Sequence, residues 1–376
     1  MYSTGIDEGL PMTTDGLPDL RREPHPNPIP AAERERLIAD PGFGSLFTDH
    51  MFTMSYHADR GWHDARVRPF APITLSPSAA VLHYAQEIFE GLKAYRYPDG
   101  GIGLFRPEAN ARRMNLSAER MAMPHLPEQW FLDSIAELLA VDGDWVPGQE
   151  EASLYLRPFM FASEQFLGVR PAKEYQYLVI ASPAGAYFKN GPQPLTLWVS
   201  EEYNRAGPGG TGAAKCGGNY AASLLPQSEA IEHGCDQVVF LDAVNYEYVD
   251  ELGGMNLFFV YENERVVYTP KLGTILPGIT RDAIFTLASE SGWEVRETDY
   301  ALTRWRDDAE SGALTEAFAC GTAAVITPIG TVKSRKGEFT VAGGEAGKFT
   351  MQLRQAILDI QHGRAEDTHG WTTRIA

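Results

Sequence analysis

Apolar residues in the first half of the chain follow two different spacings. Two runs are rich in strand-forming residues, ASLYLRPFMF at 152–161 and EYQYLVIA at 174–181. Two other segments have apolar residues at helical spacing: Pro107–Met123, with a proline in its first turn, and Pro127–Gly143, which ends at a glycine. From Phe47 to about Ile180 this mixture predicts an α+β domain.

The second half is dominated by short apolar runs that favour buried strands. They read LTLWVS, QVVFLDA, NLFFVY, RVVYT and AAVITPI. Turns separate them, as do helical segments near residues 219–233, 280–291 and 346–362. We therefore expect a larger α/β domain in which helices surround a sheet.

Segments without periodicity mark the expected boundaries. Residues 1–40 are rich in proline and charge, which predicts an N-terminal arm that packs on something else or stays mobile. Residues 182–194, SPAGAYFKNGPQP, contain three prolines and two glycines and are the expected interdomain linker. The prediction is a smaller domain at 41–181 and a larger one at 195–376.

Charge and cysteine content narrow the class of function. The net charge of -18 disfavours binding to nucleic acid or to an anionic membrane, and is compatible with an enzyme that acts on small molecules. The three cysteines, Cys216, Cys235 and Cys320, have no metal-like spacing, so neither a disulfide framework nor a metal site is expected. With no signal-like start and no long apolar run, we expect a cytoplasmic protein.

A glycine-rich stretch around one lysine, GPGGTGAAKCGGNY at Gly207–Tyr220, raises three alternatives. Its first six residues satisfy the dinucleotide-binding pattern G-x-G-x-x-G, but the polar EEYNRA separates them from the preceding strand. A phosphate loop needs glycine before the lysine and serine or threonine after it, whereas Ala214 and Cys216 stand there. The third alternative is that Lys215 is itself the reagent, with small neighbours leaving room for a planar ring; a solvated surface lysine stays open beside it.

A lysine that forms an imine with pyridoxal phosphate needs partners elsewhere in the chain. LPGITRDAIFTLA, residues 276–288, predicts a helix whose N-terminus faces an anion, and CGTAAV, residues 320–325, offers a second turn with a hydroxyl. Glu251 is a candidate partner of the ring nitrogen, or else a solvated turn acid. Arg113, taken alone, is more typical of a surface arginine than of a phosphate ligand.

Eight ordered segments together resemble the branched-chain-amino-acid aminotransferases, class IV enzymes of pyridoxal-phosphate fold type IV. The resemblance runs from about Phe43 to Ile360 through FTDHMF, LHYAQEIFEGLKAYR, LFRPEANARRMN, LYLRPF, GGTGAAKCGGNYAASL, ELGGMNLFFV, LPGITRDAI and EAFACGTAAVITPIG. It implies reversible transamination of leucine, isoleucine and valine with 2-oxoglutarate. It also implies pyridoxal 5′-phosphate as cofactor, a two-domain fold and a homodimer.

The resemblance also implies roles for individual residues. Lys215 would be the Schiff-base lysine and proton shuttle, Glu251 would face the pyridine nitrogen, and Tyr220 would bond the ring hydroxyl. The phosphate would be held by Arg113, Ile279, Thr280 and Thr322. The substrate would contact Phe43, Phe89, Tyr155, Tyr220, Thr322 and Ala323, with Arg157 anchoring Tyr155, and with Tyr84, Leu167 and Val169 supplied by the partner subunit.

Other interpretations remain at this point. D-amino-acid aminotransferases and aminodeoxychorismate lyases share the lysine, the glutamate and the glycine-threonine turn. A catalytically silent relative that only binds the cofactor is a further alternative, and a dehydrogenase would need the dinucleotide-binding context that the glycine stretch lacks.

Overall fold

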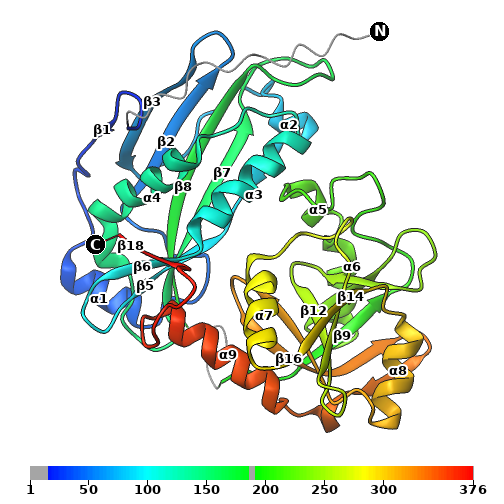
Figure 1. Ribbon diagram of the computed structural model, residues 1–376. Helices are drawn as coiled ribbons and strands as arrows, with labels where there is room; N and C mark the ends of the chain where they lie inside the picture. The colour runs from blue at the N-terminus through cyan, green and yellow to red at the C-terminus, as the bar shows by residue number, and fades with distance from the viewer. Residues whose placement is uncertain (1–15, 186–190, 376) are drawn as a thin grey trace.

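A computed structural model describes residues 16–185 and 191–375 of the chain. Two large mixed sheets, each wrapped by helices, account for most of these residues (Figure 1), as the α+β and α/β patterns predict. Among the helices in the described ranges, none combines the length and the apolar content that a membrane crossing requires.

The first sheet has the strand order β1-β3-β2-β8-β7-β5-β6-β18, with β4 paired to β7. Most neighbours in it are antiparallel. Its strands are β1 Arg21–Arg22, β2 His50–His57, β3 Gly61–Pro69, β4 Glu87–Phe89, β5 Leu92–Arg96, β6 Ile102–Phe105, β7 Ser153–Ala162, β8 Glu174–Ala184 and β18 Thr372–Arg374.

Helices cover this sheet because their apolar stripes match its buried face. The elements are α1 Ala31–Ala39, α2 Val81–Tyr84, α3 Pro107–Arg120, α4 Glu128–Asp142 and a short 3-10 turn at Gly143–Trp145. The predicted helices at 107–123 and 127–143 are thus confirmed as α3 and α4. Both contribute to one core with the sheet, in which Met114, Phe131 and Leu138 are buried.

The second sheet has the order β11-β10-β9-β16-β15-β12-β13-β14, with β17 paired to β16. Its strands are β9 Leu195–Ser200, β10 Gln237–Leu241, β11 Val249–Leu252, β12 Asn256–Tyr261, β13 Val266–Pro270, β14 Glu294–Thr298, β15 Glu316–Gly321, β16 Val325–Ser334 and β17 Gly337–Thr340. Around it lie α5 Gly217–Ala221, α6 Leu224–Glu232, α7 Ile279–Glu290, α8 Leu302–Ser311, the 3-10 turn Ala342–Gly344 and α9 Lys348–Gln361. All five apolar runs of the second half are strands, as predicted.

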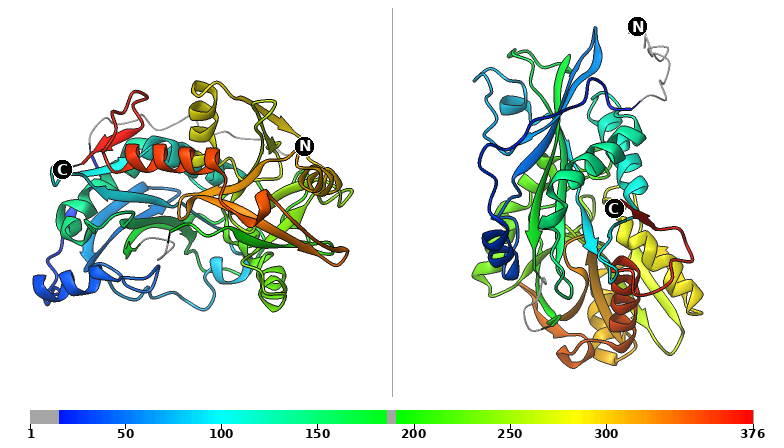
Figure 2. Two further views of the ribbon diagram at one scale, coloured as in Figure 1. Left: turned by 90° about the horizontal axis from the view of Figure 1, so that it is seen from below. Right: turned by 90° about the vertical axis from the view of Figure 1, so that its left-hand side faces the viewer.

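Two segments depart from the simple order of the chain. The described part of the expected arm packs on the first sheet: β1 pairs with β3, and Leu37 and Ile38 of α1 pack against its core. Residues 1–15 and 186–190, which hold the rest of the arm and part of the expected linker, lie outside the described residues. At the other end, α9 lies at the junction of the two halves (Figures 1 and 2), and β18 pairs with β6 of the first sheet.

Candidate active site

Lys215 lies within the glycine-rich stretch, two residues before α5 begins, and its backbone N–H and C=O are both hydrogen-bonded. Its amide donates to the Ser117 hydroxyl of α3 at 2.9 Å, and its carbonyl accepts from the Phe89 amide at 3.0 Å. The glycine content suggested freedom of the backbone here. The structure instead anchors the backbone to the first sheet and leaves only the lysine side chain to move.

The glycines around Lys215 serve close contacts more than flexibility. A Cβ at Gly212 would overlap the Thr274 carbonyl oxygen, and a Cβ at Gly217 would overlap the Glu87 carboxylate, which accepts the Gly217 N–H. At Gly218 a Cβ would meet nothing within 4 Å. Gly212 and Gly217 are therefore positions where the backbone passes close to other elements, which is a use of glycine apart from flexibility.

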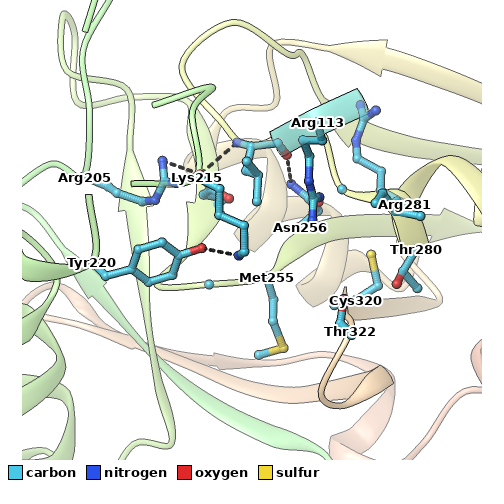
Figure 3. A pocket seen from close by; sticks show the side chains of 16 residues that line it. Arg113, Arg205, Lys215, Tyr220, Met255, Asn256, Thr280, Arg281, Cys320 and Thr322 are labelled. Atoms are coloured by element: carbon cyan, nitrogen blue, oxygen red, sulfur yellow. Dashed lines mark hydrogen bonds and ion pairs between the residues drawn. The ribbon is translucent and has the colours of Figure 1, made fainter. Parts of the chain in front are cut away.

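The Lys215 amine is partly buried beside polar and aromatic groups. Its Nζ lies 2.7 Å from the Tyr220 hydroxyl (Figure 3). The same atom lies 4.7 Å from the centre of the Phe89 ring. Burial lowers the pKa of Lys215 to about 8, and the nearby Arg113 guanidinium contributes to that lowering. The solvated-lysine alternative is therefore wrong, and at pH 7 about a tenth of the amine is uncharged.

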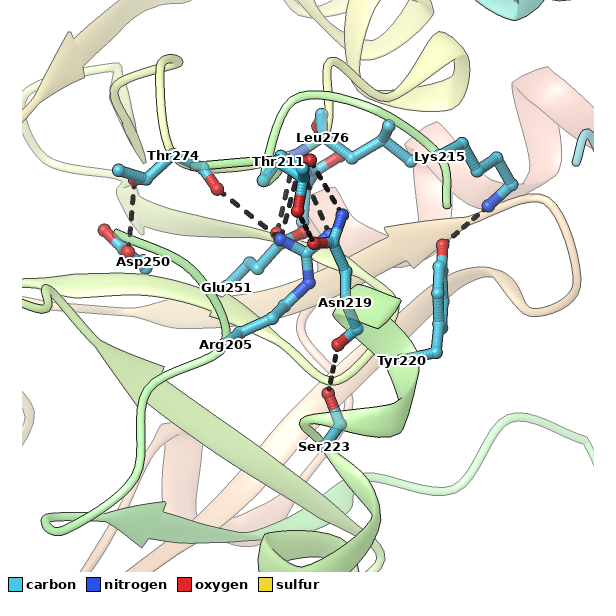
Figure 4. A network of polar contacts seen from close by, with 12 residues as sticks. Arg205, Thr211, Lys215, Asn219, Tyr220, Ser223, Asp250, Glu251, Thr274 and Leu276 are labelled. Carbon is cyan, nitrogen blue, oxygen red and sulfur yellow. Dashed lines mark hydrogen bonds and ion pairs between the residues drawn. The ribbon is translucent and has the colours of Figure 1, made fainter. Parts of the chain in front are cut away.

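Glu251 on β11 is buried, with only 2% of its surface exposed. Its carboxylate forms an ion pair with Arg205 at 2.7 Å and accepts the Leu276 N–H at 3.4 Å (Figure 4). Burial raises the pKa of Glu251 to about 7, and the Arg205 charge opposes that rise. A solvated turn acid is therefore excluded, and Arg205 favours the ionised carboxylate.

Opposite the lysine, α7 begins at Ile279 directly after Gly278. Its first N–H groups have no partner within the helix, so they can bind an anion. Arg113 of α3 reaches this helix start and donates to the Pro277 carbonyl at 3.1 Å. Two further bonds of 2.8 Å join Arg113 to Glu90, so this arginine is buried and oriented, contrary to the surface position favoured by its local sequence.

One pocket contains all of the residues predicted to bind the cofactor. These seven are Arg113, Lys215, Tyr220, Glu251, Ile279, Thr280 and Thr322. Arg205, Asn256 and Arg281 line the same pocket and were missed. Arg205 lies in EEYNRA, a polar run directly before the glycine-rich stretch, and that position was its only signal in the sequence.

Four of the residues predicted to bind substrate form a wall next to this pocket. The Phe89 ring lies 5.0 Å from the Tyr220 ring, and the Arg157 guanidinium stacks 4.8 Å from the centre of Phe89. Arg157 also donates to the Tyr155 hydroxyl at 3.2 Å. Phe43 then contacts the Tyr155 ring edge to face at 5.3 Å, so the wall is mainly aromatic with one cation inside it.

The remaining predicted residues lie elsewhere. Ala323 is in the turn that joins β15 and β16, next to Thr322. Tyr84 ends α2, and its hydroxyl contacts the Leu167 carbonyl. Leu167 and Val169 are 67% and 89% exposed, so Tyr84, Leu167 and Val169 together form an apolar surface apart from the wall.

The composition of the pocket fits a planar, anionic cofactor with a reactive carbonyl. Arg113, the start of α7 and two threonine hydroxyls supply an anion site, and Glu251 supplies a buried negative charge for a protonated ring nitrogen. Lys215 supplies an amine that is partly neutral. Pyridoxal phosphate carries each complementary group, so the residues fit it.

Comparison with known proteins identifies a family of enzymes, the class IV aminotransferases. The family model described as "Amino-transferase class IV" matches residues 87–332. A protein of Mycolicibacterium smegmatis named branched-chain-amino-acid aminotransferase is 58% identical, over 93% of this chain and 96% of its own length.

Solved structures agree on the fold. The branched-chain amino acid aminotransferase of Escherichia coli superposes with a TM-score of 0.72 at 30% identity, covering 87% of this chain and 99% of that one. The branched-chain amino acid aminotransferase of Thermobaculum terrenum, solved in its PLP form, gives a TM-score of 0.70 at 25% identity, covering 87% and 98%.

Proposed function

Because the chain belongs to the class IV aminotransferase family, we propose that it exchanges amino groups between branched-chain L-amino acids and 2-oxoglutarate. Leucine, isoleucine and valine are the proposed donors, and the products are branched 2-oxo acids and L-glutamate. The observation that carries the proposal is the partly buried Lys215 amine, 2.7 Å from the Tyr220 hydroxyl in a pocket that also holds Arg113 and Glu251.

Pyridoxal 5′-phosphate is the cofactor of this class, and it supplies an aldehyde that carries the amino group and a ring that accepts electrons. In our proposal Arg113, Thr280, Thr322 and the Ile279 amide hold its phosphate. The Tyr220 hydroxyl binds the ring hydroxyl, and Glu251 binds the ring nitrogen. Arg205 acts through Glu251, because its charge favours the ionised form of that carboxylate.

Lys215 is the proposed covalent anchor and the base that moves the substrate proton. A general base works best when its pKa lies near the working pH, and burial brings the pKa of Lys215 to about 8. Its fixed backbone restricts motion to the side chain. Displacement of the Nζ atom would therefore come from rotation about the side-chain bonds of Lys215.

Substrate selection is assigned to the aromatic wall and its rim. Phe43, Phe89 and Tyr155 offer an apolar surface for a branched side chain. Arg157, 3.2 Å from the Tyr155 hydroxyl, supplies a positive charge for the side chain of glutamate. One pocket would thus accept both partners of the exchange, with the α-carboxylate resting on the turn at Thr322 and Ala323.

We extend the proposal to a homodimer. Tyr84, Leu167 and Val169 form an exposed apolar surface in the single chain, and contact with the pocket of a second copy would bury them. The two sheets are proposed as the cores of two domains, with the boundary between β8 and β9. Cys216, Cys235 and Cys320 are all free and buried, which supports a reducing, cytoplasmic site of action.

An amino-donor panel with 2-oxoglutarate tests the function. We expect glutamate to form from L-leucine, L-isoleucine and L-valine, with the cofactor absorbance changing when donor is added alone. D-alanine as the preferred donor would instead indicate a D-amino-acid aminotransferase, and release of pyruvate from aminodeoxychorismate would indicate a lyase. Lys215→Ala, which removes the proposed anchor, should abolish turnover and the absorbance of the covalently held cofactor.

A further inference from the structure

The turn between β15 and β16, residues Thr322–Ala324, is held from behind by two buried cations. The Lys93 Nζ of β5 donates to the Ala323 carbonyl at 2.8 Å. The Arg354 Nη1 of α9 donates to the carbonyls of Ala324 and Ile326 at 2.7 and 2.9 Å. Lys93 is 7% exposed and Arg354 is 3% exposed.

These bonds surround a strained residue. Val325 has a φ of 61°, in the left-handed region that a β-branched side chain rarely adopts. Such a conformation costs free energy and persists only where its surroundings impose it. Arg354 bonds the carbonyl on each side of Val325, and Lys93 bonds the carbonyl before them, so the two cations impose the shape of the turn.

The position of Lys93 links this support to the pocket. Lys93 lies directly opposite Tyr155 in the pairing of β5 with β7. On the other side of the turn, Gly321 and Thr322 line the cofactor pocket (Figure 3). Lys93 therefore connects the substrate wall to the back of the turn.

The charged groups behind the turn, Lys93, Arg354 and Glu151, carry an excess of positive charge. Arg354 forms an ion pair with Glu151 at 2.5 Å. The Lys93 amine instead donates its hydrogen bond to a neutral group, the Ala323 carbonyl. His362, also buried nearby, has its pKa lowered to about 4 by burial, so it is neutral at physiological pH. Burial lowers the pKa of Lys93 to about 8, so this amine is mostly protonated at pH 7. Lys93, Arg354 and Glu151 then leave about one positive charge behind the turn, where the low dielectric strengthens its field.

We propose that Lys93 is a positioning residue for the substrate carboxylate: with Arg354 it fixes the turn Thr322–Ala324, and its charge favours an anion on the pocket side. The inference rests on the proposed function, because it assigns the turn to the α-carboxylate. Both substrates carry that group, so the effect of Lys93 is common to the branched-chain acid and to glutamate.

Ligand binding to the cofactor-loaded enzyme tests the role of Lys93 without any turnover. The probes are 4-methylvaleric acid and its amide, which have the same shape but differ in charge, and binding is followed by the cofactor absorbance. For Lys93→Met we expect about tenfold weaker binding of the acid, with little change for the amide. Lys93→Arg should restore most of the affinity, and the matched control Lys173→Met, at an exposed position, should behave as wild type.

Two results would overturn the inference. One is unchanged affinity of Lys93→Met for the acid; the other is an equal loss for acid and amide, which would make Lys93 a packing residue only. If Lys93→Met does not fold, Lys93→Gln keeps a donor but removes the charge, and the same ratio of acid to amide affinity is measured. Failure of the proposed function is a separate result, since wild type would then bind neither probe or would not transaminate L-leucine.

Discussion

The ionisation of Glu251 depends on Arg205, with which it forms a buried ion pair. A buried carboxylate without its cation is costly, so it takes up a proton instead. Arg205→Met should therefore raise the pKa of Glu251 above its value of about 7, and the carboxylate will ionise only at higher pH. We predict that kcat falls by about tenfold or more at pH 6 and recovers as the pH rises toward 9.

The control for this prediction is Glu251→Gln, which cannot ionise. It should keep the cofactor but react slowly at every pH, by about a hundredfold, because the ring nitrogen loses its anionic partner. Profiles of kcat between pH 6 and 9 distinguish the two variants: the rate of Arg205→Met should recover at high pH, whereas the rate of Glu251→Gln should stay low. An Arg205→Met enzyme with the wild-type profile would show that Glu251 does not need Arg205.

Lys215 gives a second prediction at the scale of one residue. Only the neutral amine attacks an aldehyde, and the pKa of the free lysine is about 8. When the cofactor-free protein is mixed with pyridoxal phosphate, the rate of covalent attachment should rise about tenfold from pH 7 to pH 9. A rate that is still rising steeply above pH 10 would show that the amine has an ordinary pKa.

Single residues were also the hardest to predict from sequence. Arg113 and Glu251 were recognised as candidates, but local sequence also allowed solvent-exposed positions for both. Both are buried beside a partner of opposite charge: Glu90 pairs with Arg113, and Arg205 pairs with Glu251. These partners are distant in the sequence, and the fold brings them together. Local patterns carry no information about such pairings. The resemblance assigned roles to Arg113 and Glu251 but named neither of their partners.

At the scale of elements, α5 is short and is held at its start by Glu87. The Gly217 N–H donates to that carboxylate, and a Cβ at Gly217 would overlap it. We predict that Gly217→Ala destabilises the protein by about 1 kcal/mol, because the Glu87 carboxylate must move aside and lose its bond with the Gly217 N–H. Cofactor binding should also weaken, because α5 carries Tyr220 and follows Lys215.

Gly218→Ala is the matched control in the same helical turn. A Cβ there meets nothing within 4 Å, so stability should stay the same or improve slightly. Thermal unfolding of both variants, with and without pyridoxal phosphate, measures the difference. Equal stability of the two variants would contradict the close contact with Glu87.

Elements were predictable where burial is strong. The runs LTLWVS and NLFFVY coincide with β9 and β12, because both faces of these strands are largely buried. Helix α8 was not predicted, since Trp305 is its only buried residue and most of its other side chains are polar. The spacing of Leu302, Trp305 and Ala309 and the following Gly312 were the available signal.

At the scale of the whole molecule, the apolar surface at Tyr84, Leu167 and Val169 leads to a prediction about assembly. If a second copy covers it, Val169→Asp should shift the protein toward the mass of a single chain and reduce activity with it. Val244→Asp, at another exposed apolar position, should leave both unchanged. Light scattering coupled to size exclusion measures the mass; a dimeric and fully active Val169→Asp would rule out this surface.

The pairing of β18 with β6 has a consequence for biosynthesis. During translation the first sheet has most of its strands once residue 184 has left the ribosome, but the edge of β6 stays open until residue 374 emerges. An unpaired edge is where nascent chains associate wrongly. The period of risk therefore spans the translation of the whole second sheet, and shielding by chaperones would matter most in that interval.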